Sequence, residues 1–345
     1  MARSFSRRWP ERPFSLITTT SHHVYAPALP SNHHAVRVAR LMALTHNTIF
    51  RAFNAIYAQA GVVDPSKTKD VADFMTFATF AIAFLDNHHQ CEENIFFPML
   101  EAQSGTPGLM THNVEQHRAF DVPLHALRRY VDEVKSGAAR LDAAALRARI
   151  QDLAVPLEQH LHDEIPSLLE LSGKLSEEAI NTCYKALHDE AEGTTDPFRI
   201  GPLVLGCQDS THLMDGEMIQ FPELPFRLVP YLVDHIVSRR YAGAWRFCPG
   251  TFHGQPRETA FFEFGKSEAS TRRKSSTSRD EILMQAALDS GITRAKRRFL
   301  VDRLATPVFV LMLLFSLYLA VAQYAANLHL PTRGKARAWV NPKLL

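Results

Sequence analysis

The chain has 345 residues, of which 46% are hydrophobic and 21% charged, a composition typical of a globular protein with one or two domains. Its formal net charge of +2 excludes the strong positive field with which proteins attract nucleic acids, so no nucleic-acid partner is predicted. The four cysteines form no CxxC pair and no zinc spacing, and we interpret them as reduced thiols.

Residues 1–34 are predicted to form an irregular lead-in, because four prolines interrupt any helix there: Pro10, Pro13, Pro27 and Pro30. The basic, serine-containing start also resembles a mitochondrial transit peptide, although it lacks a convincing amphipathic helix.

Four long helices are predicted between residues 35 and 173. The first runs from about Ala35 to Ala60 with an apolar face that includes Met42 and Phe53, and Gly61 ends it. The others run over residues 70–103, with a kink at Pro98, and over 109–135 and 138–171. Long helices joined by short turns are typical of an antiparallel four-helix bundle, so the predicted fold class is all-α.

The rest of the chain is predicted to be mostly irregular. Residues 174–264 comprise one helix and a stretch rich in proline and aromatic residues, interpreted as an appendage that packs on the bundle. Residues 265–304 are predicted to be a basic, flexible linker with a short helix.

An apolar segment near the C-terminus predicts a membrane partner. Residues 307–330 carry no charge, and roughly 24 residues of helix suffice to span a bilayer. We therefore predict a single transmembrane helix over 305–330, followed by a basic tail over 331–345. The basic residues on the linker side favour a bundle that faces the cytoplasm. The alternatives are a buried or interfacial helix, and a cytoplasmic protein.

The stretch AIAFLDNHHQCEENIFFPML, residues 81–100, carries the first chemical signal. His88 precedes Glu92 by four residues, which places both side chains on one face of a helix. That face continues through apolar residues such as Phe84 and Ile95, so an imidazole and a carboxylate on it are expensive unless they are satisfied. A metal ion satisfies them, and so does a buried His–Glu hydrogen bond. A further alternative is that both residues are half-exposed near a helix end, and the stretch alone leaves these interpretations open.

The other predicted helices carry similar residues on their apolar faces. These are His46 on the first, His117 with Asp121 on the third, and His160 with Glu164 on the fourth. Side chains on facing helices of a bundle converge on its axis. Several imidazoles and carboxylates there can hold two divalent cations bridged by carboxylates. Nitrogen and oxygen ligands without thiolates favour iron, with manganese or zinc as alternatives.

Four segments together resemble the hemerythrin-like (HHE) domain over residues 36–171: LTHNTIFRAFNAIY, HHQCEENIFFPML, NVEQHRAF and LEQHLHDEIPSLLEL. The flanking segments WPERPFSLITT and PYLVDHIVSRRYAGAWRFCPG resemble those of fungal members of this family. The resemblance implies a site with two iron ions whose ligands are His46, His88, Glu92, His117, His160 and Glu164. It assigns the bridging role to Glu92 and Glu164.

One position departs from the family pattern. The remaining ligand of the family is usually a histidine one turn after the third-helix histidine, and here that position is Asp121. Asp121 is expected either to ligate through oxygen or to orient His117, which makes the second site more anionic and reversible O2 carriage less favourable. Four other histidines are interpreted as neighbours of the site or surface residues: His89, which pairs with Glu93, His112, His125 and His162.

The resemblance implies a protein that binds O2 or iron as a carrier, store or sensor. The alternative is a di-iron oxidoreductase acting on a small organic substrate, with residues 194–264 forming the lip of a pocket. A second alternative is a metal-free structural bundle presented at a membrane. Whether the chain is an enzyme is left open at this stage.

Overall fold

The computed structural model describes residues 9–223 and 228–257. These residues are mostly helical, and their strands form one antiparallel pair, β1 (Leu213–Met214) with β2 (Glu217–Met218). The predicted linker, the apolar segment 305–330 and the basic tail lie outside the described residues, so the membrane partner stays a prediction. Within 9–223 and 228–257, no helix has the length and apolar character required to cross a membrane.

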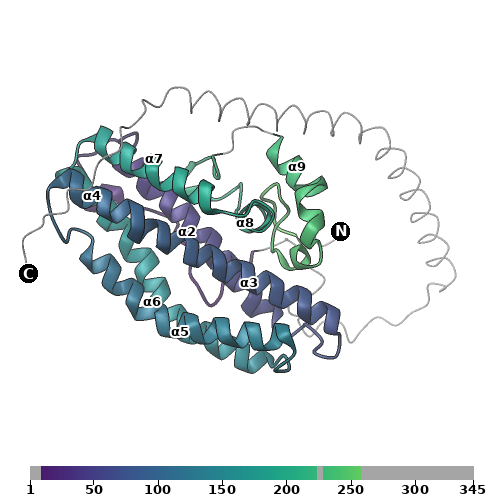
Figure 1. Cartoon of the computed structure of the whole chain (residues 1–345). Helices are drawn as coiled ribbons and strands as arrows, with labels where there is room; N and C mark the ends of the chain where they lie inside the picture. The colour runs from purple at the N-terminus through teal and green to yellow at the C-terminus, as the bar shows by residue number, and fades with distance from the viewer. Residues whose placement is uncertain (1–8, 224–227, 258–345) are drawn as a thin grey trace, which may run out of the picture. The chain divides into compact units, whose positions relative to one another are not determined.

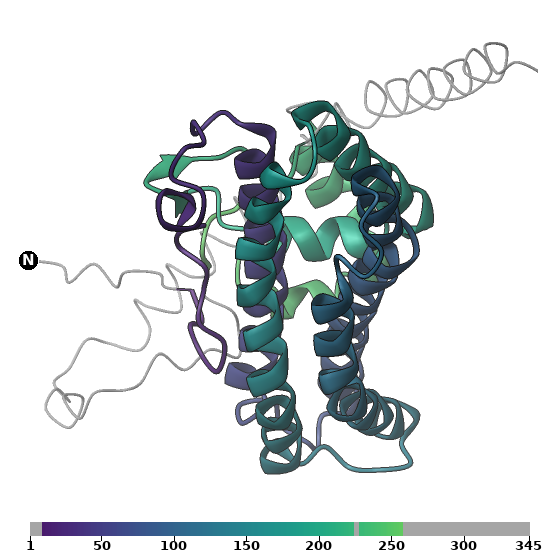
Figure 2. The same ribbon diagram turned by 90° about the vertical axis from the view of Figure 1, so that its left-hand side faces the viewer.

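Four long helical segments form the centre of the molecule. They are α2 (His34–Gln59), α3 (Thr68–Cys91), α5 (Thr111–Ser136) and α6 (Ala143–Glu170). Each packs against two others, α2 against α3 and α6, and α5 against α3 and α6, so the four segments enclose one core (Figures 1 and 2). The prediction of a helical bundle is confirmed.

The second segment continues beyond α3 through a wider turn. The π-helical turn η1 (Glu92–Phe96) joins α3 to α4 (Phe97–Ser104), and the Phe97 amide donates to the Glu92 carbonyl oxygen five residues earlier. Pro98 has no amide hydrogen, which removes one hydrogen bond of an ordinary α-helical turn. This π-turn lies directly before Pro98, where a kink was predicted, and π-turns are frequent at functional sites.

Local sequence signals explain the helix ends. The Asp142 carboxylate accepts hydrogen bonds from the amides of Ala144 and Ala145 and so caps the start of α6. Gly105 and Gly137 follow α4 and α5 with φ of 61° and 80°, a conformation that costs glycine little. These caps fix where each turn falls and therefore the register of the facing helices.

The N-terminal lead-in is irregular except for the short helix α1 (His22–Tyr25), and residues before α1 pack along α2. Phe14 and Ile17 are buried, and their amides donate to the side-chain oxygens of Asn54 and Asn47 over 2.9 and 2.8 Å. The Asp215 carboxylate, beside β1, accepts hydrogen bonds from Thr20 and Arg40 and so joins the lead-in to α2.

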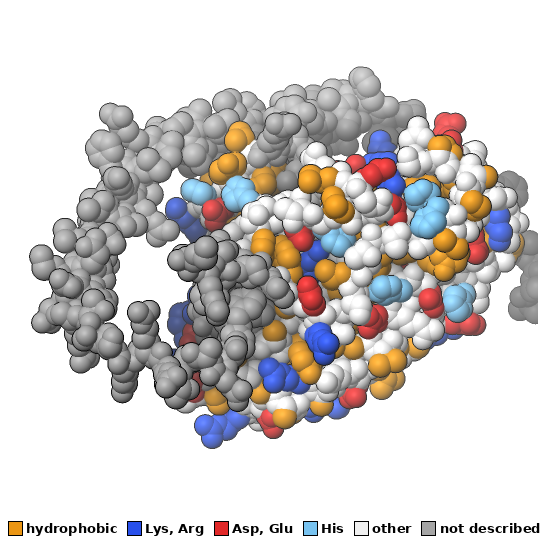
Figure 3. All heavy atoms as spheres, turned by 180° about the vertical axis from the view of Figure 1, so that it is seen from behind, with side chains coloured by type: hydrophobic (Ala, Val, Ile, Leu, Met, Phe, Trp, Pro, Cys, Tyr) orange, Lys and Arg blue, Asp and Glu red, His pale blue; other side chains and the backbone are white. Residues whose placement is uncertain are grey.

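Residues beyond the bundle cover α2 and α3. Helices α7 (Glu177–Thr194) and α8 (Ile200–Cys207) each pack against both, and η4 (Ala244–Phe247) packs on α3 (Figure 1). Helix α9 (Val229–His235) packs on α8 and is followed by η3 (Val237–Tyr241). On the face shown in Figure 3, acidic and basic side chains of the described residues are mixed, which agrees with the formal net charge of only +2.

Candidate metal centre

Five histidines and two glutamates from the four bundle segments meet in the core. All are buried. They are His46 on α2, His88 and His89 on α3, Glu92 at the start of η1, His117 on α5, and His160 and Glu164 on α6.

The seven residues form two groups that share one member. His46, His88, Glu92 and Glu164 form the first group, and His89, Glu92, His117 and His160 the second, with potential ligand atoms within 4.8 Å of one another in each. The two oxygens of Glu92 point to different groups. Oε1 lies 3.2 Å from His88 Nε2, and Oε2 lies 3.5 Å from His117 Nε2. Glu92 is therefore placed to bridge two cations.

The polar atoms at the centre lack ordinary partners. Nε2 of His46, His88 and His89 and all carboxylate oxygens of Glu92 and Glu164 are buried without a hydrogen bond. The His46–Glu164 and His88–Glu92 contacts of 3.2 Å lie within ion-pair distance but lack hydrogen-bond alignment. Buried polar atoms without partners are expensive, and a cation among them removes that cost. The donor set, imidazole and carboxylate without thiolate, fits a divalent transition metal.

Outer contacts fix the tautomer of three imidazoles. His46 Nδ1 lies 2.7 Å from the Leu161 carbonyl oxygen, which only accepts, so Nδ1 carries the hydrogen and Nε2 keeps its lone pair. His117 Nδ1 lies 2.7 Å from Glu93 Oε1 in the same way. His160 Nδ1 lies 3.3 Å from the oxygen of Gln116, whose amide nitrogen donates to Asp163.

These contacts bring two lone pairs together in the second group. His117 Nε2 and His160 Nε2 are 2.9 Å apart, and each Nδ1 already has an acceptor. Two lone pairs at this distance repel unless a proton or a metal ion lies close to both. The close approach of these two nitrogens supports a cation in the second group independently of the first group.

Burial sets the charge of the metal-free centre. It lowers the pKa of His46 to about 3 and lowers the pKa values of His88, His89 and His160 well below the usual range. Burial also raises the pKa of Glu164 to about 7, and burial together with the charge of Glu164 raises that of Glu92. Neutral imidazoles and protonated carboxyl groups are thus favoured, and a bound cation displaces the carboxyl protons.

These pKa directions predict how the metal-free protein responds to acid. A histidine with a lowered pKa stabilises the folded chain fully only above pH 6.5, its ordinary pKa. That contribution is lost as the pH falls. A carboxyl group with a raised pKa stabilises the folded chain below pH 4.5, its ordinary pKa. That contribution is lost as the pH rises through the pKa of the folded chain, which is about 7 for Glu164. Four imidazoles outnumber two carboxyl groups, so the urea midpoint of the chelator-treated chain is expected to be lower at about pH 5 than at about pH 6.5. A midpoint that rises on acidification would contradict buried neutral imidazoles.

The centre differs from the sequence-based ligand set at two positions. The six other predicted ligands lie together in it, but Asp121 is exposed and belongs to neither group. Its place in the second group is taken by His89, which the sequence analysis had left outside the set. In this geometry the second group therefore has an imidazole, that of His89, at the place where the carboxylate of Asp121 was expected.

The packing of α5 explains why Asp121 points outward. Apart from Tyr130, its buried positions recur in alternating steps of four and three residues, which defines a narrow buried stripe: Asn113, His117, Phe120, Leu124, Leu127, Val131 and Val134. Phe120 follows His117 on this stripe, and its ring centroid lies 4.8 Å from that of His89. Asp121 is one position beyond the stripe and faces solvent.

The orientation of α3 explains why His89 points inward. Adjacent helix positions are about 100° apart, so a helix that lies between two neighbours can direct one residue to each. The His88 ring centroid is 5.1 Å from that of His46 on α2, and the His89 ring centroid is 4.3 Å from that of His117 on α5. The sequence signal for this arrangement is the pair of adjacent histidines before Glu92. On a helix with two neighbours, such a pair can direct one imidazole toward each neighbour.

The fold and the donor set define a class of protein, the helical bundles with a buried histidine–carboxylate metal centre. Residues 37–171 match the hemerythrin HHE cation-binding domain. The dimeric xanthone biosynthesis cluster protein R11 of the fungus Cryptosporiopsis sp. (strain 8999) is 32% identical over 231 residues, which cover 67% of this chain and 85% of that protein. The chain belongs to the hemerythrin HHE family, as the sequence analysis expected. No solved structure matches it.

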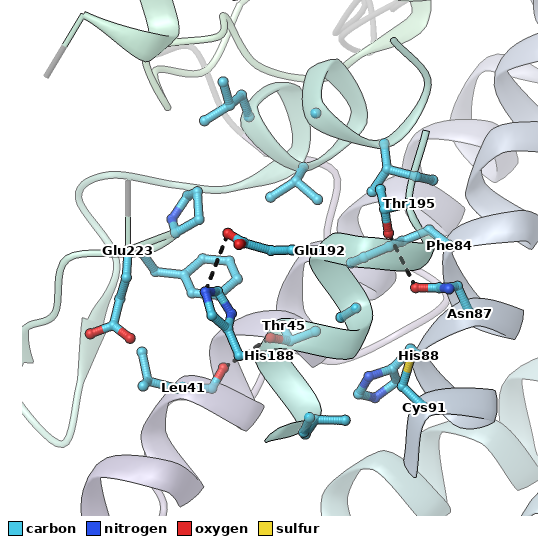
Figure 4. Close-up of a pocket in the computed structure, with 18 of the residues that line it drawn as sticks. Leu41, Thr45, Phe84, Asn87, His88, Cys91, His188, Glu192, Thr195 and Glu223 are labelled. Carbon is cyan, nitrogen blue, oxygen red and sulfur yellow. Dashed lines mark hydrogen bonds and ion pairs between the residues drawn. The ribbon is translucent and has the colours of Figure 1, made fainter. Parts of the chain in front are cut away.

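One ligand also borders a second feature. His88 is 8% exposed, and it lines a cavity of about 520 Å³ among α2, α3, α7 and α8 (Figure 4). Residues 221–223 and α9 contribute to the far wall. The first group is therefore separated from this cavity by one imidazole ring.

Proposed function

We propose that the chain is a non-haem di-iron protein with a hemerythrin-like antiparallel four-helix bundle, and that its centre binds O2 or a related small molecule. The observation that carries the proposal is the position of Glu92, whose two oxygens face two adjacent groups of donors. A shared carboxylate suits a pair of cations better than one. Imidazole and carboxylate donors suit iron, and manganese and zinc are the competitors.

The residues around the centre hold the ligands in place and exclude water. Leu161, Glu93 and Gln116 orient three imidazoles through Nδ1. The seven candidate ligands are each at most 8% exposed, and aromatic rings such as Phe120 and Phe97 pack against His117. When bound, a pair of ferrous ions supplies the electrons that O2 binding requires. The enclosed core admits a small molecule, which supports a role as carrier, store or sensor.

An optical titration tests this function. The full chain is loaded with ferrous iron under nitrogen and titrated with O2. The expected result is a new visible absorption that disappears when O2 is removed and returns when it is added again. Permanent oxidation on the first addition would contradict reversible binding.

A second candidate function is supported by a separate observation. The cavity beside His88 offers space for an organic molecule next to the metal centre. The fungal relative is named as a protein of a biosynthesis cluster, a setting in which organic molecules are modified. Both support a di-iron oxidoreductase that acts on an organic substrate. Permanent oxidation in the titration favours this candidate when an organic compound accelerates the consumption of O2.

A further inference from the structure

The cavity beside His88 is lined by residues of four helices, α2, α3, α7 and α8. Helix α7 contributes a single stripe at helical spacing, Tyr184, Leu187, His188, Ala191 and Glu192, and Thr195 follows directly after the helix. Helix α3 contributes Phe84, Asn87, His88 and Cys91 at the same spacing, and α2 contributes Leu41, Met42 and Thr45. Because whole faces line it, the cavity is part of the packing between α7 and the bundle.

The interior of the cavity is predominantly apolar and partly aromatic. Phe84, Tyr184 and Phe221 supply rings from three separate segments, and aliphatic side chains such as Leu187 and Val204 fill the walls between them. Its volume of about 520 Å³ lies within the range of pockets that bind drug-sized ligands. These walls favour a ligand with aromatic or aliphatic surface.

The charged side chains of the lining lie in exposed positions and are paired. His188 Nε2 lies 3.3 Å from Glu192 Oε1, and these side chains are 43% and 67% exposed (Figure 4). Glu223, 43% exposed, pairs with Arg37 over 2.7 Å. A charged ligand would enter apolar walls without a counter-charge, which is expensive. The lining therefore selects an uncharged ligand.

A few polar groups remain to orient such a ligand. Burial raises the pKa of Tyr184 to about 12, so its hydroxyl stays neutral and able to donate. The Asn87 amide is held by Thr194 and Thr195, and the Thr45 hydroxyl donates to the Leu41 carbonyl oxygen. On the side of the bundle, His88 of α3 is one of the residues that line the cavity (Figure 4).

We propose that this cavity binds an uncharged, largely apolar organic molecule with aromatic character, seated against the His88 ring of the metal centre. The proposal deepens the second candidate function and rests on it for the contact with the metal. Binding in the cavity itself depends on α2, α3, α7 and α8 and requires no ligand atom from a metal.

Gly201 offers a direct way to fill the cavity. It lies on α8 and lines the cavity, and a Cβ added to it meets no atom within 4 Å. Gly201→Leu therefore extends a side chain into open space and replaces a residue that weakens helices. Gly193→Leu is the matched control, because Gly193 lies on α7 outside the lining and its added Cβ also meets nothing.

The experiment measures binding of N-phenyl-1-naphthylamine, a neutral fluorescent aromatic amine, to the full chain. The expected result is saturable binding of about one probe per chain with a blue-shifted emission. Gly201→Leu is expected to weaken binding at least about tenfold, and Gly193→Leu to leave it unchanged. Ala191→Phe, which fills the cavity from α7, is expected to weaken binding as well and serves if Gly201→Leu fails to fold.

Absence of saturable binding to the full chain would overturn the proposal. Equal binding by the two leucine variants, both folded by circular dichroism, would overturn it too. Metal content after anaerobic loading with ferrous iron is determined on the same samples. A chain that binds the probe but takes up no iron refutes the di-iron function and leaves the cavity assignment in place. In the cobalt-loaded chain, the probe is expected to shift the visible absorption of the metal, and in Gly201→Leu it is not.

Discussion

Replacement of Glu92 by glutamine is expected to remove both metal ions from the chain. The change keeps the shape of the side chain but replaces two carboxylate oxygens with one neutral oxygen and a donor, so the bridge between the two groups is lost. The bundle should remain folded, because the variant also removes a buried carboxyl group that is expensive to ionise. Iron per chain by elemental analysis, together with the thermal midpoint of the metal-free protein, tests both statements.

The matched control for this variant is Glu93→Gln. Glu93 is the next residue, its side chain is 43% exposed, and it contacts His117 through Nδ1 without entering either group. It should retain both ions with an affinity for the second lowered about 10–100-fold, as is usual when an outer partner of a ligand is lost. Full iron loading of Glu92→Gln would refute the bridging role.

The second large effect concerns the choice between His89 and Asp121. His89→Ala is expected to lose the ion of the second group and to retain that of the first, because His88, His46, Glu92 and Glu164 are untouched. Asp121→Ala is expected to keep both ions, since its carboxylate faces solvent. Elemental analysis of the two variants after identical anaerobic loading distinguishes them. The opposite pattern would show that α5 is rotated relative to the structure.

Six of the seven residues expected from spacing and resemblance lie in the buried cluster of candidate ligands. His88 and Glu92, and His160 and Glu164, each share a helix face at four residues' separation, and the apolar residues around them mark that face as inward. Such periodicity is a property of one helix. It needs no knowledge of neighbouring helices, which is why it was accessible from the sequence.

The seventh candidate ligand, His89, depends on relations between helices. On a helix wheel, Asp121 shares the face of His117 as well as Phe120 does, and only the narrow buried stripe of α5 decides between them. His89 is inward because α3 faces both α2 and α5. The position of Glu92 also follows from the π-turn that begins there, and single-sequence periodicity assumes regular α-helix.

The cavity was the least accessible feature. Its lining comes from α2, α3, α7, α8, α9 and residues 221–223, which are far apart in the chain. Residues 213–223 and 228–233 carry short elements and no sustained periodicity, so the sequence offered no rule for how they pack. The stripe on α7 was periodic, but periodicity does not distinguish a face that fills a core from one that borders a cavity.

The metal stoichiometry of the full chain tests the central claim most directly. Protein purified under nitrogen and loaded with ferrous iron is passed through a desalting column, and iron and protein are determined on the same fractions. Two groups of ligands predict about two tightly held ions per chain, lost together in Glu92→Gln. Fewer than about one iron per chain would contradict a centre built around a shared carboxylate.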